Sequence, residues 1–354
     1  MAGRSAIGLD IGTSGVRAAE LSFGRGRVTL EKFGQVALTE GAVRDGEVID
    51  VDAVAEALRQ LWKATGFSGR KVVLGVGNQK VVVRQVDLPW LPADELKQSL
   101  GFQVQDFVPM PVDQAVLDFL PLEEFTGPNG GRMLRGMLVA ASREMVMTNL
   151  AAVRKAGLSP VMVDLTSFAV LRAMGREDDL GLQARAEVLV DIGARVTNIV
   201  VHAGGSPRFV RMLLMGGQDV TDAIGERLGV PQMEAEIVKQ RLSVEVGEPG
   251  GELETAARVV EVTSSSFVDE VRGTLDYYVA TSPAEPLARV VLSGGGARLR
   301  GLAEQISLAT RLPVEIGSPI SAMRVGKTGL SPEQIQYVEP LAAVPVGLAL
   351  GAAS

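Results

Sequence analysis

The sequence has 354 residues with 35 basic and 42 acidic side chains, so its net charge is −7 and its length suits two to three domains. The acidic balance argues against a nonspecific nucleic-acid binder, because such binding depends on an excess of positive charge that displaces counterions from phosphates. Cysteine is absent and His202 is the one histidine, which excludes disulfides, thiolate metal sites, cysteine nucleophiles and histidine-rich metal sites.

The beginning of the chain is expected to form a meander of hairpins followed by a helix and a strand. Alternating apolar residues predict three strands, over 5–11, 16–23 and 28–38. A helix follows, because an aspartate can cap it, apolar residues recur at helical spacing, and Gly66 stops it. A compact apolar run then predicts a strand over 71–76.

The next segment differs in composition, because prolines separate its short elements. A strand over 81–86 is broken by prolines, and a helix over 94–106 ends at the Val-Pro-Met-Pro run 108–111. Two strands over 115–122 and 133–141 and a helix over 143–156 complete a βαββα order. Residues 80–158 are therefore expected to form a small inserted subdomain.

The second half repeats the opening pattern. A strand over 161–164, a helix over 167–174 and a polar linker over 175–185 precede three strands, over 187–192, 196–202 and 208–214. The remaining elements are helices over 219–228, 232–242 and 252–279, a strand over 289–292, a glycine cluster, a helix over 302–310, a strand over 314–316 and a C-terminal helix.

Neither end of the sequence has the pattern of a targeting or membrane segment. The apolar run after Arg4 is interrupted by Asp10 and lacks the length of a signal peptide. The charge-free run over 340–354 is shorter than the roughly 20 apolar residues that a membrane span needs, so a buried helix is expected there. These features predict a cytoplasmic protein.

The most informative feature is a short motif that occurs twice, about half a chain apart. Asp10-Ile-Gly-Thr-Ser and Asp191-Ile-Gly-Ala-Arg each connect an apolar strand to a second strand. A hairpin turn of this kind presents successive backbone N–H groups, which can bind a phosphate. A single copy is most simply an ordinary turn. Two copies at the same place in each half favour a pair of phosphate-binding turns.

The residue types in the two motifs suit a metal–triphosphate complex. Glycine lets the backbone approach an anion closely, and the hydroxyl groups of Thr13, Ser14 and Thr197 add donors. Asp10 and Asp191 can hold Mg²⁺ through its waters, since this ion favours one or two carboxylates together with substrate phosphates. Two such turns facing one another would clamp a triphosphate from both sides.

Two further patterns belong to the second half. Ser293 to Leu299 is a glycine-rich strand-to-helix junction, where a base or phosphate could lie against bare backbone; a simple flexible turn is the alternative. Glu236 and Lys239 are three residues apart in a helix, so both could reach one ligand; a surface ion pair is the alternative.

The order of these motifs resembles the actin-like ATPase superfamily and, within it, the PilM family of type IV pilus assembly. Two stretches carry the closer resemblance, namely 103–111 and the segment that runs from 216–221 to 235–239. The resemblance implies an α/β fold of two related ribonuclease-H-like domains with an FtsA-type inserted subdomain. The implied boundaries are 1–79 with 159–185 (first domain), 80–158 (insert), 186–218 with 286–335 (second domain), 219–285 (helical subdomain) and 336–354 (C-terminal helix returning to the first domain).

The resemblance also implies the site residues and the cofactors, ATP and Mg²⁺. Asp164 stands where such proteins can place a water-orienting catalytic group, and Ala194-Arg195 replaces the usual hydroxyl residues, so ATP binding with slow or no hydrolysis is expected. The implied binding residues are Asp10, Gly12, Thr13, Ser14 and Arg17 in the first turn, Asp191, Gly193 and Thr197 in the second, Gly294, Gly295, Gly296 and Ala297 at the adenosine, and Glu236 and Lys239 at the ribose.

The partners follow from the same resemblance. It implies that the protein binds the cytoplasmic N-terminal tail of a PilN-like membrane protein, contacts the pilus motor, and reaches the inner membrane only through partners. It leaves self-association open. Phe107, Pro109 and Pro111 are the candidate partner residues; the alternative is a helix stop that packs under the insert.

Two other functions use the same fold. An FtsA-like cell-division protein would need a basic, aromatic amphipathic helix at its C-terminus, and residues 339–354 have neither feature. A small-molecule kinase would need a second aspartate as general base, for which Asp164 is the candidate.

Overall fold

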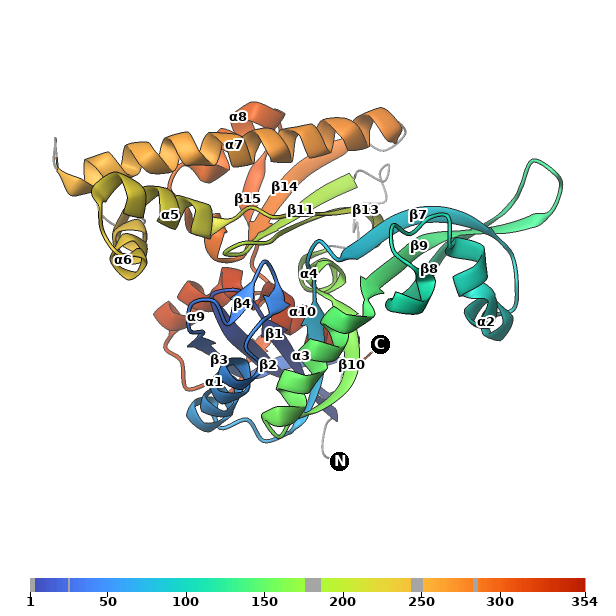
Figure 1. Cartoon of the computed structure of the whole chain (residues 1–354), viewed down its shortest axis with the longest axis horizontal. Helices are drawn as coiled ribbons and strands as arrows, with labels where there is room; N and C mark the ends of the chain where they lie inside the picture. Colours follow the sequence, from blue (N-terminus) through green and yellow to red (C-terminus); the bar gives the residue numbers. More distant parts are fainter. Residues whose placement is uncertain (1–3, 25, 176–185, 243–250, 283–285, 354) are drawn as a thin grey trace.

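The computed structural model describes residues 4–24, 26–175, 186–242, 251–282 and 286–353, and shows two sheets that lie one above the other with a third sheet projecting to the side (Figure 1). The predicted linker over 175–185 therefore lies outside the described residues from 176 onward. The predicted boundaries at 185 and 285 also fall on undescribed residues.

The first sheet has six strands and forms the first domain. An antiparallel meander of three strands is continued on one side by two parallel strands and on the other by a two-residue strand from late in the chain. In the order in which they lie, the strands are β10 (Ser159–Leu165), β6 (Lys71–Val76), β1 (Arg4–Ile11), β2 (Gly15–Gly24), β3 (Arg27–Ala37) and β16 (Arg324–Val325).

Strand alternation decides what covers each face of this sheet. Ile7 and Leu9 of β1 pack against α1 (Val51–Thr65) on one face. Gly8 faces the other way, where an added Cβ would lie 2.0 Å from the carbonyl oxygen of Pro345, so only glycine lets α10 (Ala343–Gly351) approach this closely. The C-terminal helix therefore packs on the first domain, beside α4 (Thr166–Met174).

The second sheet repeats this plan and forms the second domain. Its meander is continued by two parallel strands, and the helices α7 (Glu252–Thr281) and α8 (Leu302–Thr310) cover its outer face through a large apolar cluster. Its strands, in spatial order, are β13 (Ser206–Leu213), β12 (Thr197–Ala203), β11 (Ala186–Ile192), β14 (Leu287–Ser293) and β15 (Val314–Ile316).

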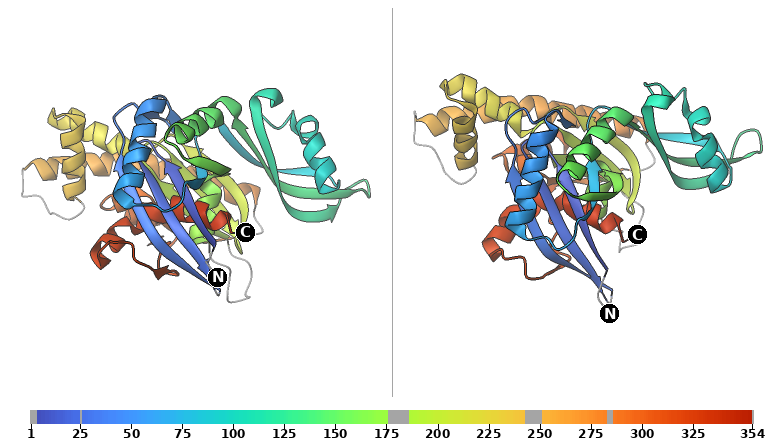
Figure 2. Two further views of the ribbon diagram at one scale, coloured as in Figure 1. Left: turned by 90° about the horizontal axis from the view of Figure 1, so that it is seen from below. Right: turned by 60° about the horizontal axis from the view of Figure 1, so that its bottom comes forward.

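The insert is a three-stranded sheet covered on one face by a helix. Its strands lie in the order β7 (Val81–Pro89), β9 (Arg132–Ser142) and β8 (Ala115–Thr126), and α2 (Ala93–Val104) packs on them through Leu96 and Leu100. Two further views show that the insert projects from one side of the molecule, opposite the helices of the second domain (Figure 2).

The helix α3 (Arg143–Lys155) differs from its predicted place within the insert. Met145 and Val146 near its start pack with strand residues of the insert, whereas Ala152 and Val153 near its end lie in the core beneath α1. The helix thus belongs to both bodies, because its apolar stripe passes from one core to the other.

The smaller elements complete the two domains. A helical group formed by α5 (Gly217–Leu228), α6 (Gln232–Leu242) and the first half of α7 has its own apolar cluster beside the second sheet. The remaining short elements are β4 (Val43–Arg44), β5 (Glu47–Val48), α9 (Pro332–Val338), and three 3₁₀ helices, Val112–Gln114, Gly295–Arg298 and Glu339–Ala342.

One apolar cluster joins all the parts. It contains Val73 of the first sheet, Met137 of the insert, Leu171 of α4, Val210 of the second sheet and Leu348 of α10. Strands β7 and β13 also lie against each other, so the insert contacts both domains. Within the described part of the chain, every helix is too short or too polar to cross a lipid bilayer.

Candidate functional site

The two repeated motifs form equivalent tight turns. In the first, the N–H of Gly12 donates to the carbonyl oxygen of Gly15 at 3.0 Å; in the second, the N–H of Gly193 donates to that of Val196 at 3.0 Å. Glycine is required in the second turn, because an added Cβ on Gly193 would lie 2.6 Å from the carbonyl oxygen of Val196. Each turn follows the central strand of its sheet.

The first turn has exposed hydroxyl groups and one cation of its own. Thr13 is half-buried and Ser14 is exposed. The guanidinium of Arg17 lies 3.6 Å from the carboxylate of Asp10, from Nη1 to Oδ2, and donates a long hydrogen bond of 3.5 Å to the Oγ of Ser14. Burial raises the pKa of Asp10, and the charge of Arg17 opposes this.

The second aspartate is more deeply buried and faces the first. Asp191 is 8% exposed, and its Oδ1 accepts a hydrogen bond of 2.8 Å from the hydroxyl of Ser293. Burial raises its pKa from the ordinary 3.8 to about 6; hydrogen bonding from Ser293 lowers it, and the negative charge of Asp10 raises it further. The two carboxylates are thus close enough to repel each other across the domains.

A divalent cation would relieve this repulsion. No cluster of three or more metal-ligating side chains occurs among the described residues, so Asp10 and Asp191 alone cannot complete a coordination shell. This donor set suits Mg²⁺, which keeps several waters and takes the rest of its ligands from phosphates. The two aspartates are therefore close enough to influence each other's ionisation, and their role as metal ligands stays a prediction.

The second turn is anchored to the start of α5. Its two carbonyl oxygens, on Gly193 and Ala194, accept hydrogen bonds of 2.9 and 2.8 Å from the N–H groups of Gly217 and Gln218. Thr197 is fully buried and its hydroxyl donates to the carbonyl oxygen of Met215 at 2.8 Å. The sequence suggested that the hydroxyl of Thr197 would be a donor to a phosphate. In this structure the hydroxyl is buried and instead bonds the backbone next to the turn.

Arg195 is also held by α5. Its guanidinium donates to Asp219 at 2.8 Å and also pairs with Asp222. The bulky cation that the sequence puts in this turn is therefore neutralised by two carboxylates of the helix.

Glu236 and Lys239 form a network at the start of α5, which extends beyond the surface ion pair that spacing alone favoured. Lys239 Nζ donates to the carbonyl oxygen of Gly217 at 2.9 Å and to Thr221 Oγ1 at 2.7 Å, and lies 2.6 Å from Glu236 Oε2. The lysine side chain is only 14% exposed. Because Gly217 also binds the second turn, α6 and this turn are neighbours.

The glycine-rich loop lies directly against the second turn. Gly294 has a φ of 80°, and an added Cβ on it would lie 2.3 Å from the carbonyl oxygen of Ile192. Gly296 and Ala297 are buried, whereas Gly295 is exposed. The sequence placed Ser293 at the start of this loop but gave no sign of its contact with Asp191, which follows from the parallel register of β11 and β14.

Asp164 makes its contacts within the first domain. It is the next-to-last residue of β10, at the same end of the sheet as Asp10, but its carboxylate pairs with Arg172 of α4. Arg172 in turn donates to the carbonyl oxygen of Gly347 at 3.0 Å. The contacts of Asp164 thus join strand and helices, and its catalytic role stays a prediction.

The predicted partner residues are on the surface of the insert. Phe107 is 39% exposed and Pro109 and Pro111 are exposed, whereas Val108 between them packs in the core of the insert. The helix α2 ends before this segment, as the helix-stop alternative expects, while Phe107 leaves part of its surface exposed; both interpretations stay predictions. Phe102 on α2 is 80% exposed and was missed, since its neighbours gave no reason to expect it outside.

Further contacts join the two domains. The hydroxyl of Ser167 on α4 donates to the amide oxygen of Asn198 on β12 at 2.9 Å. With its amide turned to suit both neighbours, Gln232 of α6 donates to the carboxylate of Glu40 at 2.7 Å. Both pairs connect the first domain to the second.

These features define a class of protein. Two related domains, each built on a three-stranded meander with parallel strands added, place two equivalent turns at the boundary between the domains. This is the actin-like ATPase fold, with the FtsA-type insert between parts of the first domain.

The comparisons with known proteins give the family. Residues 8–353 match the family model described as type IV pilus assembly protein PilM, and the chain belongs to this family. A solved PilM–PilN type IV pilus biogenesis complex contains a chain that is 28% identical, with a TM-score of 0.85 over 99% of this chain and 98% of that one.

More distant relatives share the fold. Cell division protein FtsA of Pseudomonas aeruginosa is 25% identical over 362 residues, covering 90% of this chain and 84% of the relative. For FtsA of Bacillus subtilis the identity is 26%, over 67% of this chain and 57% of the relative's length. MreB5 of Spiroplasma citri, solved with ADP, matches with a TM-score of 0.53 at 14% identity over 98% of this chain and 95% of that one, which is a likeness of fold.

Proposed function

We propose that this protein is a cytoplasmic scaffold of type IV pilus assembly that binds ATP with Mg²⁺ between its two domains and holds the cytoplasmic tail of a PilN-like membrane protein. The nucleotide sets the angle between the domains, and this angle sets the affinity for the tail. The observation that carries the nucleotide half of the proposal is the repulsion between Asp10 and Asp191, two largely buried carboxylates at equivalent turns.

The chain's own residues would hold the triphosphate by backbone donors and by charge. The turns at Gly12 and Gly193 would each offer N–H groups to the phosphates, with the hydroxyls of Thr13 and Ser14 as further donors on the first side. Mg²⁺ would supply the positive charge between the carboxylates and the phosphates. The loop at Gly295 would receive the nucleoside, because its exposed glycine offers bare backbone.

The bound ATP would be hydrolysed slowly. Attack on a terminal phosphate needs a group that orients the water. The predicted candidate, Asp164, is engaged by Arg172. The second turn has Ala194 where a hydroxyl would add a donor, and Arg195 is occupied by Asp219 and Asp222. The nucleotide would therefore act mainly as a ligand that stabilises one domain arrangement.

The tail of the membrane partner would bind along the insert, in the groove between it and the first domain. Similarity to the PilM chain of a PilM–PilN complex supports this, as do the exposed aromatic side chains of Phe102 and Phe107 beside two exposed prolines. Exposed large apolar side chains that gather on one element are typical of a binding surface. Contact with the pilus motor and attachment to the inner membrane through the partner complete the proposal.

The packing of the insert offers a route from nucleotide to partner. Met137 of the insert shares a core with Val210 of the second domain and Leu171 of the first. A rotation of the second domain would therefore move the surface against which the insert is packed. A coupling of this kind is reciprocal, so the tail would also raise the affinity for the nucleotide that favours the same angle.

The test of the nucleotide half measures binding of a fluorescent ATP analogue in the presence and absence of Mg²⁺. Asp10→Ala and Asp191→Ala should each remove Mg²⁺-dependent binding while the circular dichroism spectrum stays that of the wild type. Asp276→Ala, an exposed aspartate of α7, is the matched control and should bind normally. Wild-type affinity in both site variants would contradict the assignment.

The test of the partner half uses a synthetic peptide that copies the cytoplasmic tail of a candidate partner. Phe107→Ser should weaken its binding about tenfold, since an aromatic anchor of an interface commonly contributes at least that much. Leu308→Ser on α8, a side chain that is 81% exposed on the second domain, is the control. Equal loss of peptide binding in both variants, or no binding by the wild type at high micromolar peptide, would contradict the proposal that the tail binds along the insert.

A further inference from the structure

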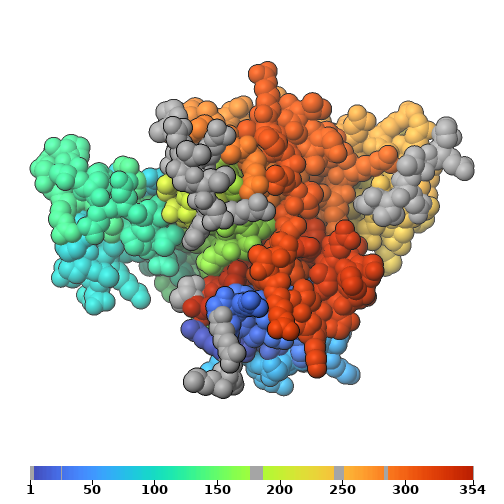
Figure 3. Space-filling view, turned by 180° about the vertical axis from the view of Figure 1, so that it is seen from behind, coloured from blue at the N-terminus to red at the C-terminus, as the bar shows by residue number. Residues whose placement is uncertain are grey.

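A cavity of about 580 Å³ lies at the hinge between the two domains, away from the facing turns. The end of α4 at Gly175 borders it, and so does the chain that crosses from β15 of the second sheet to β16 of the first. Arg27 lines its far end and follows the end of β2 opposite to the turn at Gly12. On the back of the molecule, the orange atoms of the chain near β15 run down towards the blue atoms of the first sheet (Figure 3).

The lining of this cavity is rich in arginine, and its arginines differ in their pairing. Arg289 is held by Glu187 at 2.8 Å and by Glu315 at 2.9 Å, and Arg172 is paired with Asp164. Within the part of the chain that the structure describes, Arg27 and Arg324 have no acidic partner. Both belong to the first domain's edge, because β16 pairs with β3 just beyond Arg27.

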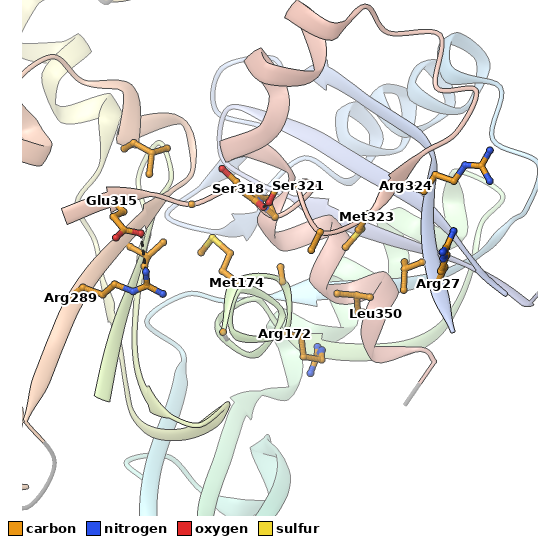
Figure 4. Close-up of a pocket in the computed structure, with 18 of the residues that line it drawn as sticks. Arg27, Arg172, Met174, Arg289, Glu315, Ser318, Ser321, Met323, Arg324 and Leu350 are labelled. Atoms are coloured by element: carbon orange, nitrogen blue, oxygen red, sulfur yellow. Dashed lines mark hydrogen bonds and ion pairs between the residues drawn. The ribbon is translucent and has the colours of Figure 1, made fainter. Parts of the chain in front are cut away.

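The remaining lining is apolar in the middle and has hydroxyl groups on one side. Figure 4 shows Arg27 and Arg324 at one end, the Arg289–Glu315 pair at the other, and Met174, Met323 and Leu350 between them. Unpartnered guanidinium groups that gather at one end bind phosphate oxygens well, because arginine presents a fork of parallel donors. Methionine side chains adapt to a flat or irregular apolar body.

We propose that this hinge cavity is a second binding site, which takes an organic phosphate monoester with a planar or apolar body. Arg27 and Arg324 hold the phosphate, and Met174 and Met323 contact the body of the ligand. The volume of about 580 Å³ falls in the range of roughly 300–1,000 Å³ that is usual for small-molecule sites. The ligand is therefore about the size of a mononucleotide.

The position of the cavity gives the site a consequence for the hinge. Its walls come from both domains, since Val28 and Leu350 belong to the first and Val291 and Ile316 to the second. A ligand that touches both walls favours one angle between them. Resting on the proposed function, this ligand and ATP are then coupled, and each changes the affinity of the other by the same factor.

The experiment uses guanosine 5′-monophosphate and guanosine as probes, titrated by calorimetry into the full-length protein with ADP and Mg²⁺ present in excess to occupy the site between the turns. The monophosphate should bind and guanosine should not, because guanosine lacks the group that Arg27 and Arg324 hold. The double variant Arg27→Gln/Arg324→Gln should bind the monophosphate about tenfold more weakly or worse, since it loses two charged donors. The variant Ser321→Glu, which adds a negative charge to the lining, should weaken binding as well.

The controls separate this site from the site between the turns. Arg84→Gln removes an exposed arginine of the insert, Asp276→Ala removes an exposed charge of α7, and both variants should bind the monophosphate normally. Monophosphate binding that depends on Arg27 and Arg324, with no binding of ADP, would support the hinge site and refute the nucleotide half of the proposed function. Wild-type affinity in the double variant, or no binding by the wild type at millimolar monophosphate, would overturn the hinge site.

Discussion

The first and second turns share the Asp-Ile-Gly motif, yet their surroundings hold them in different ways. The first turn is open, with Ser14 exposed and Arg17 beside its aspartate. The second turn is anchored by the N-terminus of α5, and its aspartate is buried against the hydroxyl of Ser293. The motif therefore fixes the backbone geometry of both turns, while the neighbouring elements leave the side chains of the first turn open and hold the second turn rigidly.

The largest expected effect comes from removing the charge of the anchored aspartate. Raising the pKa of Asp191 from 3.8 to about 6 means that ionising it in the folded protein costs on the order of 3 kcal/mol at neutral pH. Asp191→Asn should therefore raise the free energy of unfolding of the ligand-free protein at pH 7, and should lower the affinity for ATP with Mg²⁺ about a hundredfold, the scale of a lost charged contact. Thermal melts and titrations of the nucleotide measure the two opposite changes.

The dependence of the unfolding free energy on pH provides a control for this prediction about Asp191. Because the folded-state pKa lies above the unfolded one, Asp191 stabilises the fold below pH 3.8 and loses this contribution as the pH rises to about 6. The ligand-free wild type should thus lose stability across this window, and Asp191→Asn should lose less. Identical pH profiles for the two proteins would show that Asp191 does not titrate as the structure indicates.

The second prediction compares the glycines of the two turns directly. Gly193→Ala should lower the free energy of unfolding by about 2 kcal/mol, because its Cβ would lie 2.6 Å from a backbone oxygen. Gly12→Ala should change stability by less than about 1 kcal/mol, since its Cβ would meet the flexible end of Arg17 at 3.3 Å. Urea unfolding of both variants checks the difference, and a larger loss for Gly12→Ala would reverse the assignment of rigid and open turns.

Much of this contrast could not be predicted from the sequence. The repeated motif and the alternation of apolar residues predicted both meanders and the two equivalent turns. The contact of Ser293 with Asp191 depends on the register of two strands far apart in the sequence, which no local pattern encodes. A strand of two residues, such as β16, is too short to show an alternation of apolar and polar residues. The sequence therefore gave no sign that the chain returns from β15 to the first sheet, or of the cavity beside that segment.

The third prediction concerns the hydroxyl that supports the anchored aspartate. Ser293→Ala removes a donor to a buried carboxylate and should raise the pKa of Asp191 further. The affinity for ATP with Mg²⁺ should then fall about tenfold at pH 6 and less at pH 8, because more of the carboxyl is protonated at the lower pH. Ser14→Ala, the hydroxyl of the open turn, should give a loss that does not vary with pH. A pH-independent loss in Ser293→Ala would show that the serine acts on the ligand and not on the aspartate.

The smallest expected effect concerns Arg195, the cation that distinguishes the second turn from the first. Its pairs with Asp219 and Asp222 involve side chains that are about one-third exposed, so Arg195→Ala should lower the free energy of unfolding by no more than about 1 kcal/mol. Since the guanidinium is held by α5, its removal should leave the affinity for ATP within about threefold, whereas Arg17→Ala in the open turn should change it more, because Arg17 lies beside Asp10. Parallel titrations of the two variants measure this ratio. A greater loss for Arg195→Ala would mean that the guanidinium leaves α5 when the nucleotide binds, and the second turn would then be a donor of charge as well as a support.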